Sequence, residues 1–223
     1  MFRYQVIADL LKLEEFIDFL PETNPDEVYF MSLMARSKDG SLPKVKNSEI
    51  YGTKRAVTKK NIVRCLREYE IPVGGYARSG VEIQQEHLSP YITINPRSLS
   101  EAAKKTCLEL TNRLITSPND LINPADFSMR MIHQSVGTKH FIDFDFDNAD
   151  VADIHEKLKN IPFSTGKTLI TKGGFHLIYP SKEVGSRYND IVKLGCDVHG
   201  SSGMIPIPGC YQRGFVPYFS EDF

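Results

Sequence analysis

The chain has 223 residues, of which 41% are apolar and 25% charged, and its formal net charge is −1. These are the values of an ordinary soluble protein with a normal buried core, and a net charge near zero gives no overall attraction to nucleic acid. Charged residues interrupt the first twenty positions, which excludes a signal peptide or membrane span there, so we expect a cytoplasmic protein with no membrane partner.

The first half of the chain predicts an N-terminal α/β module, residues 1–135. Its expected elements, in chain order, are a helix over 3–20, a strand over 28–35, a helix over 58–70, a strand over 90–97, a helix over 98–115 and a helix from 124. Ser98 and Glu101 have the spacing of a capping box, and Pro124 suits a first helical position after Asn123.

Basic residues are concentrated between residues 36 and 67. This stretch contains ten basic residues and only two acidic ones, Asp39 and Glu49. The basic residues are Arg36, Lys38, Lys44, Lys46, Lys54, Arg55, Lys59, Lys60, Arg64 and Arg67. A stretch of this density can follow a phosphate backbone, although a solvated face of mobile lysines explains it equally well.

The second half of the chain, residues 136–223, has a more regular pattern. Its expected elements are strands over 140–147, 167–172, 174–180 and 203–207, with helices over 149–160 and 187–195. This β-α-β-β-α-β order is the ferredoxin-like order that RNA-recognition modules and polymerase palms share. We therefore expect an α/β protein of the α+β type, in which the two units form one compact, bilobed body.

Three aspartates alternate with apolar residues in HFIDFDFDN, residues 140–148. A strand would place Asp143, Asp145 and Asp147 on one face and the apolar side chains on the other. Carboxylates so close repel one another, and a hard cation such as Mg²⁺ or Mn²⁺ would relieve that repulsion. The sequence leaves a metal site and a solvated acidic face equally open. An EF-hand loop is excluded, because its sixth and twelfth positions would be Asn148 and Ile154.

Two later stretches carry further candidates. In TKGGFHLIYP, residues 171–180, His176 is predicted on the face opposite Phe175 and Leu177, where with Lys172 it could hold nucleotide phosphates. In CDVHGSSGMIPIPGC, residues 196–210, Asp197 could add a metal-binding carboxylate. Cys196, His199 and Cys210 could instead bind zinc, but their spacing fits no common finger, and we favour plain packing of reduced thiols.

Taken together, these stretches resemble the signature of the archaeo-eukaryotic primase superfamily, especially its primase-polymerase branch. Members share a DxD strand, an SxGxxH-like motif, and a third acidic residue near a turn of the hydrophobic-Arg-hydrophobic-Pro-Gly type. The corresponding segments are Asp143-Phe144-Asp145, Thr171 to His176, and Asp197 followed by Ile205 to Gly209. YITINPRS, residues 91–98, also resembles a segment that precedes the catalytic core. Thr171 stands in place of the serine and Pro206 in place of the arginine.

The resemblance implies a nucleotidyltransferase that acts in DNA replication in a phage, plasmid or other mobile element, within a bacterial or phage-infected cell. Asp143, Asp145 and Asp197 would be catalytic and hold two ions, Mg²⁺ or Mn²⁺. Lys172, Gly174, His176 and Arg213 would bind the NTP or dNTP. Arg55, Lys59, Lys60 and Arg97 would contact a single-stranded DNA template, and a separate replicative helicase is a further conceivable partner.

Two other functions stay open on sequence grounds. The same carboxylates and ions would serve a metal-dependent nuclease. A non-catalytic module that binds single strands or nucleotides is the second alternative, although such modules usually present stacking aromatics rather than aspartates on the open sheet face.

Overall fold

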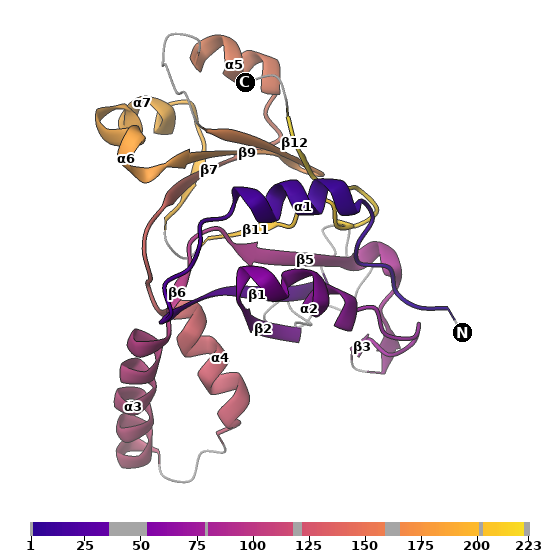
Figure 1. Ribbon diagram of the computed structural model, residues 1–223, viewed down its shortest axis with the longest axis vertical. Coiled ribbons are helices and arrows are strands. Elements are labelled where there is room, and N and C mark those ends of the chain that lie inside the picture. The colour runs from indigo at the N-terminus through magenta and orange to yellow at the C-terminus, as the bar shows by residue number, and fades with distance from the viewer. Residues whose placement is uncertain are drawn as a thin grey trace.

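The computed structural model describes residues 2–35, 53–78, 80–117, 122–158, 166–200 and 203–220. It is a mixed α+β protein in which two antiparallel sheets lie on either side of helix α1 (Leu10–Phe19), as Figure 1 shows. This confirms the predicted class. A third, two-stranded sheet pairs β3 (Ala77–Arg78) with β4 (Val81–Glu82).

The first sheet has the strand order β11-β5-β1-β2, and a further short strand, β6, pairs with β1. The strands are β1 (Glu27–Ala35), β2 (Thr53–Val57), β5 (Leu88–Thr93), β6 (Arg97–Ser98) and β11 (Met204–Pro206). Alternate residues of β1, including Tyr29, Met31 and Leu33, belong to a core cluster with Leu13 and Phe16 of α1. The same cluster takes in α2 (Ile62–Glu68), which follows a short 3₁₀ turn (Lys59–Asn61).

Helix α1 is shorter than predicted, because the chain before it is bound in extended form. Ile7 forms an isolated bridge with Cys210, and the Glu70 carboxylate accepts hydrogen bonds from the backbone N–H groups of Val6 and Ile7. These bonds satisfy donors that a helix would otherwise satisfy. The helix starts after Asp9, whose side chain accepts from the first turn.

Helices α3 (Leu99–Thr116) and α4 (Pro124–Gln134) project from the first sheet as a pair (Figure 1). Both predicted starts are confirmed. The Ser98 side chain accepts from Glu101 N–H, and the Asn123 side chain accepts from two backbone donors in the first turn of α4. A pocket of about 370 Å³ between the two helices contains none of the predicted site residues.

The second sheet has the strand order β10-β7-β9-β8-β12, with every neighbouring pair antiparallel. Its strands are β7 (Phe141–Asp147), β8 (Lys167–Thr171), β9 (Gly174–Pro180), β10 (Asp197–His199) and β12 (Tyr218–Phe219). One face buries Phe144, Phe175 and Leu177 with residues of α5 (Val151–Leu158) and α7 (Tyr188–Val192). The other face turns toward α1, where Leu169 and Ile178 join the first core cluster.

The strand predicted at 203–207 is present as β11, but it pairs with β5 of the first sheet. The strand that follows the helices of the second unit and pairs with β7 is instead β10, at 197–199. A second correction concerns the helix expected over 187–195. The helix there, α7, is shorter than expected, and it follows a separate short helix, α6 (Ser181–Val184), and a 3₁₀ turn (Gly185–Arg187). The segment from residue 197 onward therefore contributes β11 to the first sheet and β10 and β12 to the second.

Asn95 fixes the start of β7 against the end of β5. Its amide group donates to the carbonyl of Phe141 (2.9 Å) and accepts from the N–H groups of His140 and Phe141, both at 2.8 Å. The side chain is buried, so these three bonds are well shielded from water. They hold the aspartate-bearing strand in a defined position relative to the first sheet.

Candidate functional site

Polar side chains from three strands gather on the α1-facing side of the second sheet. Asp145 of β7 lies directly opposite His176 of β9 and Asp197 of β10, and Asp143 lies directly opposite His199. Residues paired across antiparallel strands share a face of the sheet. The acidic strand and the predicted histidine are thus side by side, and Asp197, although 52 positions after Asp145 in the sequence, is on the neighbouring strand.

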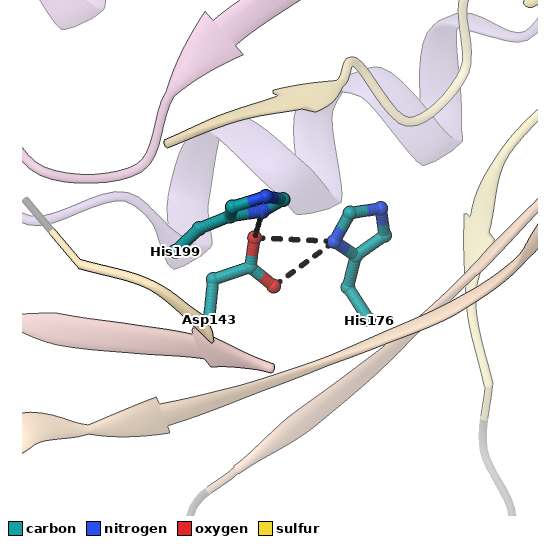
Figure 2. Close-up of side chains that lie close together, drawn as sticks. All are labelled: Asp143, His176 and His199. Atoms are coloured by element: carbon teal, nitrogen blue, oxygen red, sulfur yellow. Dashed lines mark hydrogen bonds and ion pairs between the residues drawn. The ribbon is translucent and has the colours of Figure 1, made fainter. Parts of the chain in front are cut away.

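Asp143 is the centre of the site. Its carboxylate is 1% exposed, and the imidazoles of His176 and His199 both point at it (Figure 2). His176 Nδ1 lies 3.0 and 3.1 Å from the two carboxylate oxygens, and His199 Nδ1 lies 3.2 Å from Oδ2. The two rings approach from different strands, so the register of β9 and β10 on β7 sets this geometry.

The charges of these groups are strongly coupled. Burial disfavours the charged form of Asp143, but the two histidines outweigh that effect and hold the pKa of Asp143 below its ordinary value. The pKa of His176 is raised, because the charge and hydrogen bond of Asp143 exceed the opposing effect of burial. The hydrogen bond to Asp143 likewise raises the pKa of His199.

Asp145 has the opposite behaviour, although it is only two residues away on the same strand. Burial raises its pKa, and the charge of Asp143 adds to the rise against the opposing effect of His176. Its side chain is 23% exposed, and Oδ1 lies 3.7 Å from His176 Nε2. Asp147 and Asp197 are exposed. The site therefore has a buried carboxylate, Asp143, that is held by histidines, a partly exposed one, Asp145, and two exposed ones.

The group of described residues whose ligand atoms all lie within 4.8 Å of one another is Asp143, His176 and His199. The structure does not bring the predicted trio of Asp143, Asp145 and Asp197 to that spacing, although Asp145 and Asp197 are paired on the same sheet face. Carboxylate oxygens suit Mg²⁺ and Mn²⁺, and this face carries them on two strands. The sequence suggested His199 only as a zinc ligand together with cysteines, not as a neighbour of Asp143. Its alternation with Asp197 places both residues on one face of β10, but a strand of three residues is too short to predict from sequence.

Lys172 and Arg213, both predicted to bind nucleotide, lie together beside the β8–β9 turn. The Lys172 ammonium donates to the Arg213 carbonyl (2.6 Å), and the Lys172 N–H donates to the Gln212 side chain (2.8 Å). Gly174 has a structural reason to be glycine, since its φ is +154° and a Cβ there would lie 1.9 Å from the Phe146 carbonyl oxygen.

The four residues predicted to contact the template differ in their burial and hydrogen bonding. Arg97 is 0% exposed and donates to the Ser135 carbonyl (3.2 Å), so its assignment to a template contact is wrong. Lys59 is 16% exposed and donates to the carbonyls of Asp18 and Leu20, where it satisfies acceptors at the end of α1. Arg55 is partly exposed beside Glu68 (3.9 Å), and Lys60 is exposed. The basic residues at 36–46 lie outside the described residues.

The cysteines lie apart from the candidate metal cluster. All four are free thiols, and the clustered metal-ligating groups of the described residues include none of them. Cys196 donates to the Ile191 carbonyl at 3.6 Å, and burial raises its pKa to about 11. Cys210 is buried in the core cluster around α1.

Comparison of the chain with protein-family models, with curated proteins and with solved structures finds no match. Among the described residues, no helix combines the length and the apolar character needed to cross a bilayer.

Proposed function

We propose that the protein is a primase-polymerase, a nucleotidyltransferase that extends or begins a strand on a single-stranded DNA template. The observation that carries the proposal is the convergence of Asp143 and Asp145, His176, and Asp197 on one face of three neighbouring strands. These are the residues of the three motifs in which the sequence resembles the archaeo-eukaryotic primases. Segments this far apart in a chain meet only through the fold.

The topology of the second sheet supports the same proposal. The elements β7-α5-β8-β9-α6/α7-β10 follow a β-α-β-β-α-β order, and the four strands are arranged β10-β7-β9-β8. We interpret this arrangement as a ferredoxin-like palm, to which β12 adds an edge strand. Helices α5 and α7 cover one face of this sheet, and the candidate site residues lie on the opposite face, which turns toward α1.

The carboxylates are the groups that would hold the ions. Asp145 and Asp197 lie opposite each other with access to water, and Asp143 lies behind them. Two divalent ions, when bound, would neutralise the triphosphate and activate the 3′-hydroxyl. His176 would act mainly by orienting Asp143, because its Nδ1 faces that carboxylate and its ring is 6% exposed.

Positive charge for the incoming triphosphate would come from the β8–β9 turn. Lys172 and Arg213 are adjacent there through the bond from the Lys172 ammonium to the Arg213 carbonyl. Arginine and lysine side chains bind phosphate through charge-assisted hydrogen bonds. Exposed Lys60 and Arg55 are the remaining candidates for contact with the template backbone. A separate replicative helicase is the further protein partner that this function suggests.

The test is incorporation of labelled nucleotides on a single-stranded template with Mg²⁺ or Mn²⁺. We expect the wild-type protein to make or extend a primer and Asp145→Asn to abolish this activity while remaining folded. Asp147→Asn, on the same strand face but exposed at its end, is the matched control and should keep most of the activity. Degradation of the strand without incorporation would instead establish a nuclease, and strand binding with neither activity would establish a passive module.

A further inference from the structure

The imidazole of His199 gives the site a donor set that a site of carboxylates alone lacks. Two nitrogen donors and one carboxylate meet in Asp143, His176 and His199, and Figure 2 shows both rings directed at the same carboxylate. Carboxylate and water oxygens suit Mg²⁺, whereas imidazole suits first-row transition ions. Two histidines with one carboxylate form a ligand set typical of zinc and non-haem iron sites that keep open positions.

The Asp143 carboxylate lies at ligand spacing from both histidines. Two ligands that each lie about 2.1 Å from one ion are separated by roughly 3.0 Å in an octahedral arrangement and roughly 3.4 Å in a tetrahedral one. Both histidines lie at such a distance from one oxygen, Asp143 Oδ2: His176 Nδ1 at 3.1 Å and His199 Nδ1 at 3.2 Å. Ligand atoms of all three residues lie within 4.8 Å of one another, so the remaining adjustment on binding an ion falls between the two histidines.

The position of His199 is set by its surroundings. Its strand pairs with β7 so that His199 lies directly opposite Asp143. Gly203 packs so closely against His199 that a Cβ at residue 203 would lie 2.4 Å from the His199 Cβ. The His199 side chain is 37% exposed, which leaves a path to water on one side of an otherwise buried cluster. This combination of a fixed ring and an open side is expected of a ligand that admits an exchangeable ion.

We infer that Asp143, His176 and His199 bind a divalent transition-metal ion, of the class of Mn²⁺, Co²⁺ or Zn²⁺, in preference to Mg²⁺. In the context of the proposed function this ion would occupy the inner position, with Asp145 and Asp197 left for a second, oxygen-bound ion. Only that placement rests on the proposed function. Binding of the first ion requires neither nucleotide nor template.

The experiment is a titration of the metal-stripped full-length protein with Co²⁺, whose visible absorption reports nitrogen ligation. We expect one Co²⁺ bound per chain, resistant to a large excess of Mg²⁺, and an affinity that falls by more than about tenfold in His199→Gln. His199 is partly exposed at a strand end, so this variant should fold, which circular dichroism checks. His140→Gln changes a histidine just before β7 that lies outside the cluster, and it should bind Co²⁺ as the wild type does.

Three results would overturn the inference: no Co²⁺ bound by the wild type, equal affinity in His199→Gln, or ready displacement by Mg²⁺. Failure here can be told apart from failure of the proposed function. Nucleotide incorporation by a protein that binds no Co²⁺, or binds it equally well in His199→Gln, would refute the transition-metal site and leave the polymerase intact. Co²⁺ binding that depends on His199, without any incorporation, would do the reverse.

Discussion

Neutralising Asp143 and neutralising Asp145 should change stability in opposite directions, although both residues lie on the same strand face. Asp143 is buried and accepts hydrogen bonds from two histidines. Each charge-assisted bond is worth about 1.5–3 kcal/mol, and breaking a buried ion pair typically costs about 3–5 kcal/mol. An asparagine keeps one acceptor oxygen, so we expect Asp143→Asn to lower the free energy of unfolding by about 3 kcal/mol.

Asp145 carries a raised pKa, which means that the fold disfavours its charged form. Asp145→Asn removes the repulsion from Asp143 and loses only a 3.7 Å contact with His176. We expect it to change stability by less than about 1 kcal/mol and to raise rather than lower it, as is common where function maintains unfavourable charge. The gain in stability would accompany loss of activity.

Urea denaturation of metal-free protein at neutral pH, followed by circular dichroism, measures both effects. A loss of about 3 kcal/mol is a large part of the 5–15 kcal/mol that typically stabilises a domain, so the difference between the variants should be plain. Equal losses in the two variants would refute the assignment of Asp143 as the histidine-held carboxylate. A greater loss of unfolding free energy in Asp145→Asn than in Asp143→Asn would refute that assignment as well.

Three further predictions follow from single contacts. The raised pKa of His176 means that its stabilising effect is fully present below the ordinary histidine pKa of about 6.5 and is lost as the pH rises through the folded-state pKa. The difference in unfolding free energy between wild type and His176→Asn should therefore narrow as the pH rises above about 6.5; a constant difference in denaturation experiments would contradict this. Gly174→Ala should lower the free energy of unfolding by about 3 kcal/mol or more, because the added Cβ would meet the carbonyl oxygen of Phe146. Gly200→Ala, where a Cβ would have no atom within 4 Å, should lie within about 1 kcal/mol of wild type. Similar melting temperatures for the two variants would argue against a close contact between residue 174 and the Phe146 carbonyl. Lys60→Ala should weaken the binding of a labelled single-stranded DNA and reduce the salt dependence of that binding. Lys59→Ala loses the hydrogen bonds to the carbonyls at the end of α1, so it should mainly lower the melting temperature. The reverse pattern would show that the template contacts are misassigned.

The two central strands of the second sheet were predictable from their sequence pattern. Polar and apolar residues alternate in FIDFDFD, and His176 interrupts the apolar residues of GFHLIYP, so their faces could be assigned before their partners were known, and the structure has the same faces. Helix starts were equally predictable where a side chain caps them, as at Ser98 and Asn123. These features are local, because each depends on residues within one or two turns of the chain.

What the sequence could not provide was long-range pairing. β10 has only three residues, too few for the alternation of Asp197 and His199 to predict a strand, yet it carries both to β7. The pairing of β11 with β5 joins the end of the chain to the first sheet, which no local pattern encodes. The same applies to Arg97, whose charge predicted an exposed contact while tertiary packing buries it.

We propose that one face of the second sheet binds both metal ions and a nucleoside triphosphate. The decisive measurement is a crystal structure of the protein soaked with Mn²⁺ and a non-hydrolysable nucleotide, recorded with anomalous scattering. We predict manganese peaks in contact with Asp143 and Asp145, with the triphosphate bound to the same ions and extending toward Lys172. Manganese absent from these carboxylates, or a nucleotide bound elsewhere on the protein, would contradict the account.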